Sequence, residues 1–258
     1  MFSDPYAHAI ALIAGLLVGS FLNVLIVRLP RNESVVGGRS RCTTCRKTIA
    51  WYDNIPVISF IALKGRCRHC RSPISIRYLI VELISGGIAV ALVAHFGFSL
   101  LALWMYVFLA ILLVITLVDW SHQIIPDVLS LGGIVLGWTG AVVCLPVSLP
   151  DSLIGAFAGG GVLYGVGKVY KIIRKAEGMG GGDVKLMGMI GAFLGWQMVF
   201  PVLLIASFFG AAYGIYLLIR GESSQTPVAF GSFLAPAAAV VLIFGAELWR
   251  GYMGFFLR

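Results

Sequence analysis

Long apolar runs, separated by short polar segments, make up most of this chain. Eight of them approach the ~20 residues that an α-helix needs to cross the hydrocarbon core of a bilayer. These runs are residues 7–27, 78–97, 99–118, 128–147, 152–172, 185–200, 202–219 and 232–250. The pattern predicts an all-α polytopic membrane protein with about eight transmembrane helices.

The apolar stretch from Leu186 to Ile219 is the hardest to divide, because it is too long for a single crossing. Pro201 lies inside it, and proline either ends or kinks a helix. We predict two helices joined by a tight turn between Gly195 and Pro201. One tilted helix with a kink at the proline is the alternative.

Residues 28–77 form the longest polar segment. Eleven of the 19 Lys and Arg residues lie in it, with only two acidic residues, Glu33 and Asp53. Because basic loops stay on the cytoplasmic side of a membrane, we place this segment in the cytoplasm and the N-terminus outside. The predicted domains are therefore a first transmembrane helix at 1–27, a small cytoplasmic domain at 28–77 and a membrane domain at 78–258.

Composition agrees with the membrane class. The chain is 59% hydrophobic and 12% charged, with a mean hydropathy of +0.96, whereas soluble domains are ~45–50% apolar and ~25% charged. The net charge of +8 is concentrated in one loop, so we expect contact with the lipid bilayer and no nucleic-acid partner. The first apolar run lacks a basic leader segment and is expected to be retained as a helix.

Two C-x2-C pairs lie in the cytoplasmic segment. They are Cys42 with Cys45 and Cys67 with Cys70, separated by 21 residues. This spacing is close to that of common zinc modules, and cytoplasmic thiols stay reduced. Four thiolates fill a tetrahedral shell, so we predict a structural Zn²⁺ with no open position for catalysis. A redox pair of C-x2-C motifs is the alternative.

Three of the acidic positions at or inside the apolar runs are candidates for a functional role. Glu82 falls near the start of the second run, where an ionisable group indicates either a functional role or an ion pair with Arg77. Asp119 ends the third run and Asp183 opens the sixth. Two crossings separate these aspartates, so the topology places both at the cytoplasmic membrane edge.

Two carboxyl groups brought close together share one proton and titrate as a unit. One can then activate a water while the other polarises a carbonyl, which is the division of labour in aspartic proteases. The alternative is that each aspartate caps a helix. Capping suits Asp183, which follows glycines at a helix start, but a carboxylate at a helix C-terminus, as for Asp119, is unfavourable.

Four further residues are candidates for a supporting role. Gly180 and Gly182 precede Asp183 and would allow strained backbone angles or close approach of a substrate chain. Asp127 follows Pro126, where an N-cap is the other interpretation. Lys185 would either tune the charge of Asp183 or mark the cytoplasmic boundary.

Four sequence pieces, in order, resemble one known family. They are GSFLNVLIVRLPR at Gly19–Arg31, the two C-x2-C pairs, the D-x6-PD block from Asp119 to Asp127, and GGGDVK at Gly180–Lys185. The chain resembles the bacterial type IV prepilin leader peptidase/N-methyltransferase family, which are membrane aspartyl proteases of the GxGD type.

This resemblance implies a substrate and a second activity. Asp119 and Asp183 would be the catalytic pair, cutting the short basic leader of a prepilin or type II secretion pseudopilin after a glycine at the cytoplasmic face of the bacterial inner membrane. Residues 28–77 would mark the bifunctional form, which N-methylates the new N-terminal residue with S-adenosylmethionine. A transporter with a regulatory zinc domain and a zinc-binding membrane scaffold are the alternatives.

Overall fold

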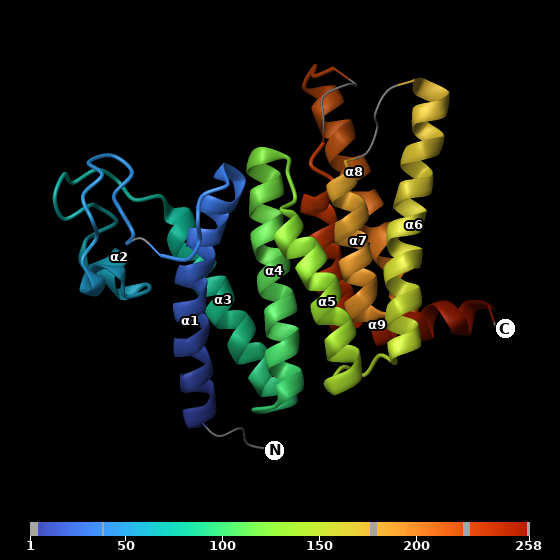
Figure 1. The fold of residues 1–258 in the computed structure, drawn as a ribbon, viewed down its shortest axis with the longest axis horizontal. Helices are drawn as coiled ribbons and strands as arrows, with labels where there is room; N and C mark the ends of the chain where they lie inside the picture. Colours follow the sequence, from blue (N-terminus) through green and yellow to red (C-terminus); the bar gives the residue numbers. More distant parts are fainter. Residues whose placement is uncertain (1–4, 38, 176–179, 224–227, 257–258) are drawn as a thin grey trace. The chain divides into compact units, whose positions relative to one another are not determined.

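The chain folds as an all-α protein, as the apolar pattern predicts. A computed structural model describes residues 5–37, 39–175, 180–223 and 228–256 (Figure 1). Eight long helices in these ranges coincide with the eight apolar runs: α1 Pro5–Arg28, α3 Ile76–Phe96, α4 Leu100–His122, α5 Asp127–Val143, α6 Leu149–Arg174, α7 Gly181–Leu194, α8 Val199–Ile219 and α9 Gly231–Phe256. Five of them are long and apolar enough to cross a membrane, so the count of eight crossings stays a prediction.

The apolar stretch after residue 185 forms two helices, which confirms the first interpretation above. Helix α7 ends at Leu194, and Gly195 has a φ of +81°, a conformation that favours glycine. A short 3₁₀ turn over Trp196–Met198 leads into α8. Pro201 therefore lies in the first turn of α8, where proline is tolerated, and the break falls at the glycine instead.

Two compact units divide the chain, Met1–Ala110 and Ile111–Arg258, with the boundary inside α4. In the first unit, α1 and α3 pack side by side. Their backbones approach so closely that a Cβ added to Gly15 would lie 2.8 Å from the Cα of Gly86. The Ser85 hydroxyl also donates a hydrogen bond of 2.7 Å to the carbonyl oxygen of Gly15.

The segment between α1 and α3 contains little regular structure. Its short elements are the 3₁₀ turns Leu29–Arg31 (η1) and Trp51–Asn54 (η2) and the five-residue helix Ile58–Ala62 (α2). Two isolated antiparallel bridges, Arg41 with Thr48 and Arg66 with Pro73, are the extended pairings found in the described part of the chain. The four cysteines lie beside these bridges, so cross-linking by a metal is a natural way to hold this segment together.

In the second unit, α7 is the central helix. It packs against α5, α6 and α9, and its residues from Leu186 to Leu194 are all buried. Small residues allow this close packing: a Cβ on Gly155 of α6 would overlap the backbone of Gly191, and one on Gly137 of α5 would lie 2.7 Å from the Cβ of Ala192. The packing holds the first turn of α7, which carries Asp183, in a defined place.

Candidate active site and metal centre

Asp119 and Asp183 lie at the same cavity of the second unit. The cavity has a volume of about 290 Å³, and both aspartates line it. Asp119 comes from the last turn of α4 and is 4% exposed, and Asp183 is the third residue of α7 and is 9% exposed. The structure therefore brings together two carboxyl groups that the sequence places only on the same side of the membrane.

The N-terminus of α9 supplies hydrogen-bond donors to both carboxylates. The backbone N–H of Ser232 donates to Asp119 Oδ2 at 2.8 Å, and the Ser232 hydroxyl lies 3.2 Å from the same oxygen. The backbone N–H groups of Gly231 and Gly180 face the Asp183 carboxylate. Because a helix N-terminus carries a partial positive charge, α9 stabilises negative charge on this pair.

Sequence reasoning missed Gly231 and Ser232. A Cβ added to Gly231 would lie 2.9 Å from Asp119 Oδ2 and 2.7 Å from the Cδ1 of Ile125, so only glycine fits at this place. The signal was present in the sequence, as a Gly-Ser pair that opens the last apolar run on the predicted cytoplasmic side. Nothing in that pair, however, indicated which carboxylates it would meet.

The glycines directly before Asp183 do not serve to allow strained backbone angles. Gly180 has an ordinary φ of −71°, and neither Gly181 nor Gly182 has a positive φ. The expectation of strained backbone angles is therefore wrong for Gly180 and Gly182. The expected approach of a substrate chain stays a prediction, but another part of this chain does come close: a Cβ on Gly182 would lie 2.9 Å from the Cβ of Ile125. Gly182 thus lets the segment after α4 pack onto the start of α7.

Asp127 and Lys185 form an ion pair at the rim of the site. The Lys185 Nζ lies 2.7 Å from Asp127 Oδ1 and 2.8 Å from Oδ2. Lys185 therefore pairs with Asp127 and not with Asp183. Asp127 is the first residue of α5, directly after the N-cap Pro126. Both side chains are well exposed, so this pair adds little stability and mainly connects α5 to α7.

The four predicted zinc ligands also meet. One sulfur from each of Cys42, Cys45, Cys67 and Cys70 lies within 4.8 Å of the others, and the Sγ atoms of Cys42 and Cys70 are 3.8 Å apart. Four sulfurs at ~2.3 Å from a tetrahedral Zn²⁺ are about 3.8 Å from one another, so the arrangement fits the ion.

Each C-x2-C pair adopts the same turn. The N–H of Arg46 donates to the Cys42 carbonyl oxygen at 2.9 Å, and the N–H of Arg71 donates to that of Cys67 at 2.9 Å. Arg46 and Arg71 both have a φ of +57°. Two copies of one local turn, facing each other, therefore assemble the four sulfurs.

Local hydrogen bonds prepare this cluster to bind a cation. The backbone N–H of Cys45 faces the Cys42 sulfur and lowers the pKa of that thiol to about 6. The Ser72 hydroxyl likewise lowers the pKa of Cys70. The N–H of Lys47 favours the Cys45 thiolate, but burial and the three neighbouring thiols outweigh it and raise the pKa of Cys45 to about 11. Four sulfurs this close cannot all ionise without a metal, which is the condition that Zn²⁺ relieves.

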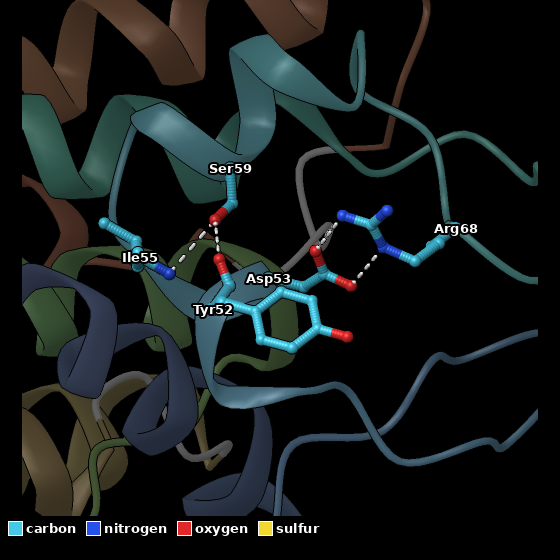
Figure 2. A network of polar contacts seen from close by, with 5 residues as sticks. All are labelled: Tyr52, Asp53, Ile55, Ser59 and Arg68. Carbon is cyan, nitrogen blue, oxygen red and sulfur yellow. Dashed lines mark hydrogen bonds and ion pairs between the residues drawn. The ribbon is translucent and has the colours of Figure 1, made fainter.

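A polar network extends from the second C-x2-C pair (Figure 2). Arg68, between Cys67 and Cys70, binds the Asp53 carboxylate through both Nε and Nη2, at 2.8 and 2.6 Å. This hydrogen bonding to Arg68 lowers the pKa of Asp53. Nearby, the Ser59 hydroxyl donates to the Tyr52 carbonyl oxygen at 2.8 Å and accepts from the N–H of Ile55 at 3.1 Å.

Two family models match separate parts of the chain, one around each of these sites. The Bacterial Peptidase A24 N-terminal domain matches residues 13–96, which contain the cysteine cluster. The Type IV leader peptidase family matches residues 106–215, which contain both aspartates. No solved structure matches the chain.

Curated relatives are similar over nearly the whole length. A prepilin leader peptidase/N-methyltransferase of Burkholderia pseudomallei is 38% identical over 93% of this chain and 86% of the relative. Relatives with the same name from Pseudomonas aeruginosa and Aeromonas hydrophila are 36% and 37% identical, over 98% and 94% of this chain and 96% and 92% of their own. The transporter alternative has no support among these matches. The chain therefore belongs to the prepilin leader peptidase/N-methyltransferase family.

Proposed function

We propose that this protein cuts the leader from a prepilin or type II secretion pseudopilin and then N-methylates the new N-terminal residue. Its family and its apolar helices make it a multi-pass protein of the bacterial inner membrane. The observation that carries the peptidase assignment is the pair of buried carboxyl groups, Asp119 and Asp183, at one cavity.

The geometry of the pair suits aspartyl protease chemistry. Two carboxyl groups at one cavity hold a single proton between them more readily than two negative charges. The ionised member takes a proton from a water molecule, and the protonated member donates a hydrogen bond to the scissile carbonyl. The N–H groups of Gly231 and Ser232 hold the two carboxyl groups in position and offset their negative charge.

The position of the pair suits the substrate. Both aspartates lie at helix ends, one near the C-terminus of α4 and the other in the first turn of α7. With the basic segment 28–77 in the cytoplasm and the N-terminus in the periplasm, these ends face the cytoplasm. A leader cut there, after glycine, leaves the apolar helix of the pilin in the bilayer. The partners we propose are this substrate and lipid, with no nucleic acid.

The segment between α1 and α3 that carries the four cysteines (the cysteine-held segment) is the proposed methyltransferase region. Zn²⁺ bound by its four cysteines would have no open coordination position, so its role is structural. S-adenosylmethionine, when bound, supplies a methyl group activated by its sulfonium sulfur. What this chain must provide is a folded site for that donor and access for the new N-terminal amine.

Mass spectrometry of a pilin N-terminus tests both activities at once. A candidate prepilin is produced with and without this protein, and its N-terminal peptide is measured. We expect the leader to be lost and the new N-terminus to gain one methyl group only when the protein is present. An unchanged prepilin N-terminus in its presence would contradict the peptidase assignment, and cleavage without methylation would contradict the second activity.

A further inference from the structure

A second cavity lies within the Met1–Ala110 unit. Its volume is about 440 Å³, within the ~300–1,000 Å³ of typical small-molecule sites. Its walls come from α1, from the cysteine-held segment and from the first turns of α3, and neither Asp119 nor Asp183 contributes to it. The peptidase chemistry therefore gives this cavity no role.

Asn23 presents an unused acceptor at this cavity. It is 4% exposed, and its amide nitrogen donates to the carbonyl oxygen of Tyr78 at 3.0 Å. This bond settles the orientation of the amide, because a carbonyl oxygen can only accept. The Oδ1 atom of Asn23 is buried and has no hydrogen-bond partner. A buried polar atom in this state is costly unless a ligand satisfies it.

Glu82 presents a buried carboxyl group at the same cavity. It is 8% exposed, and its Oε2 accepts from the N–H of Val57 at 2.8 Å. The sequence allowed an ion pair between Glu82 and Arg77, but the structure does not form it. Glu82 has no cation partner among the described residues. The Nε atom of Arg77 is buried without a hydrogen-bond partner. A carboxylate buried among polar but uncharged partners suits a cationic ligand.

The backbone that binds Glu82 is strained. Val57 has a φ of +62°, which is rare for a β-branched residue. Its N–H donates to Glu82 from this conformation, and Val57 itself lines the cavity. Strain of this kind persists where surrounding structure holds it, and it is concentrated at binding sites.

We propose that this cavity binds S-adenosylmethionine, with Glu82, Asn23 and Arg77 as its polar contacts. The proposal rests on the methyltransferase function proposed above and adds the place and the residues. S-adenosylmethionine carries a sulfonium and an ammonium group, a carboxylate and an adenine amino group. Glu82 offsets the positive charge, Arg77 binds the carboxylate, and the Asn23 Oδ1 accepts an N–H.

Charge also distinguishes this ligand from the pilin leader. Several basic side chains line the cavity, among them Arg28, Arg41, Lys47 and Arg77. A prepilin leader is itself basic. These cations repel a basic peptide, but they tolerate a small ligand that brings its own carboxylate and meets Glu82 with its cationic end.

The zinc centre positions one wall of this cavity. Asp53, Ser59 and Arg68 all line it, and Arg68 holds Asp53 from its place between two cysteine ligands (Figure 2). Loss of Zn²⁺ would therefore release Arg68 and the 3₁₀ turn that carries Asp53. We therefore expect loss of the structural metal to weaken binding of the methyl donor.

Photolabelling of the wild-type protein tests the location without any substitution. The full-length, zinc-loaded protein in detergent is irradiated with 8-azido-S-adenosylmethionine, and the labelled peptides are identified by mass spectrometry. We expect labels within residues 20–28 and 40–82, reduced by excess S-adenosylmethionine. Labels confined to residues 111–258 would overturn the proposal. Labelling here that phosphatidylglycerol vesicles abolish, and S-adenosylmethionine does not, would make this a lipid headgroup site and overturn it too.

Equilibrium binding of S-adenosylmethionine tests the role of Glu82. We expect Glu82→Gln to weaken binding at least ~10-fold, because it removes a buried charge but keeps the shape of the side chain. Glu33→Gln is the matched control, since Glu33 is exposed and does not line the cavity. Zinc content together with the unfolding temperature reports whether each variant folds. Wild-type affinity in Glu82→Gln would overturn the proposal, and a Glu82→Gln protein without zinc leaves the photolabelling result to decide it.

The outcomes separate this proposal from the proposed function. If the wild-type protein methylates a pilin but carries no label in the first unit, the cavity assignment fails and the methyltransferase function stands. If the wild-type protein neither binds S-adenosylmethionine nor methylates a pilin, the function itself fails.

Discussion

The carboxylate cavity in the second unit and the cysteine cluster in the first unit are built in opposite ways. The four sulfurs meet because one short turn occurs twice, once around Cys42 and once around Cys67. The two aspartates meet because the start of α9 binds Asp119 of α4 through Ser232, and because Gly182 at the start of α7 packs against Ile125, which follows α4. The first site depends on local chain geometry and a metal, and the second on the packing of whole helices.

Because the two sites are built differently, we expect substitutions outside the cysteines and the aspartates to affect them differently. A cluster made of local turns needs its ligands and little else, so substitutions away from the cysteines should leave metal binding intact. A cavity made by helix packing depends on residues that never touch the substrate, such as Gly182 and Gly231. Four experiments test whether the two sites depend on different parts of the molecule, and they are ordered by the size of the effect we expect.

Removing either carboxylate charge should have the largest effect. Asp119→Asn and Asp183→Asn each take away one member of the proton-sharing pair, so we expect prepilin cleavage to fall by ~10²–10⁴-fold or more. Cleavage in membranes, followed over time, measures this. Zinc content should not change, because the cysteines lie in the other unit. Near-normal cleavage by either variant would show that the aspartyl mechanism is wrong.

Removing one cysteine ligand should abolish metal binding. We expect Cys67→Ser to lose its zinc and to expose the segment between α1 and α3 to proteolysis, since binding of a structural zinc is worth ~10 kcal/mol or more of folding free energy. Zinc content by mass spectrometry and limited proteolysis measure the two effects. Cys144→Ala is the control, because Cys144 lies at the C-cap of α5 and outside the cluster. Equal zinc in both variants would contradict the four-cysteine site.

Adding one methyl group at the start of α9 should impair the peptidase alone. The new Cβ of Gly231→Ala would press on Asp119 and Ile125, and a displacement of ~1 Å at a catalytic group can cost ~10²-fold in rate. We expect cleavage to fall by up to this amount. Gly214→Ala in α8 is the matched control, because its Cβ would meet nothing within 4 Å. Similar cleavage by both variants would mean that α9 does not position the pair.

Lowering the pH should have the smallest effect, which we expect at the ion pair between Asp53 and Arg68 beside the cysteine cluster. Hydrogen bonding to Arg68 lowers the pKa of Asp53 in the folded protein. The pair therefore stabilises the fold above the ordinary aspartate pKa of ~3.9, and this stabilisation is lost as pH falls through the lower folded value. We expect the unfolding-temperature difference between wild type and Asp53→Asn to be largest near neutral pH and to shrink below pH ~4. A difference independent of pH would contradict the ion-pair explanation.

Individual residues show where prediction from sequence succeeded and where it failed. The break between α7 and α8 lies within the expected range of Gly195 to Pro201: it begins at Gly195, and Pro201 lies in the first turn of α8, where proline is tolerated. Lys185 was expected either to tune the charge of Asp183 or to mark the cytoplasmic boundary, and its ion pair with Asp127 on a neighbouring helix was not foreseen. The register between two helices decides such contacts, and no local pattern encodes it.

Sequence patterns were sufficient to predict the helical class, the apolar runs that become the long helices and the four cysteines that cluster; the position of both aspartates on one side of the membrane stays a prediction. Each of these follows from period, spacing or charge within a short stretch of chain. Tertiary packing alone places Asp119 and Asp183 at one cavity and lets the N-terminus of α9 donate to both. It also leaves the Asn23 Oδ1 without a hydrogen-bond partner in a second cavity, where Glu82 accepts a hydrogen bond from the N–H of Val57. Such contacts join residues that are distant in the chain, and helix packing sets their geometry.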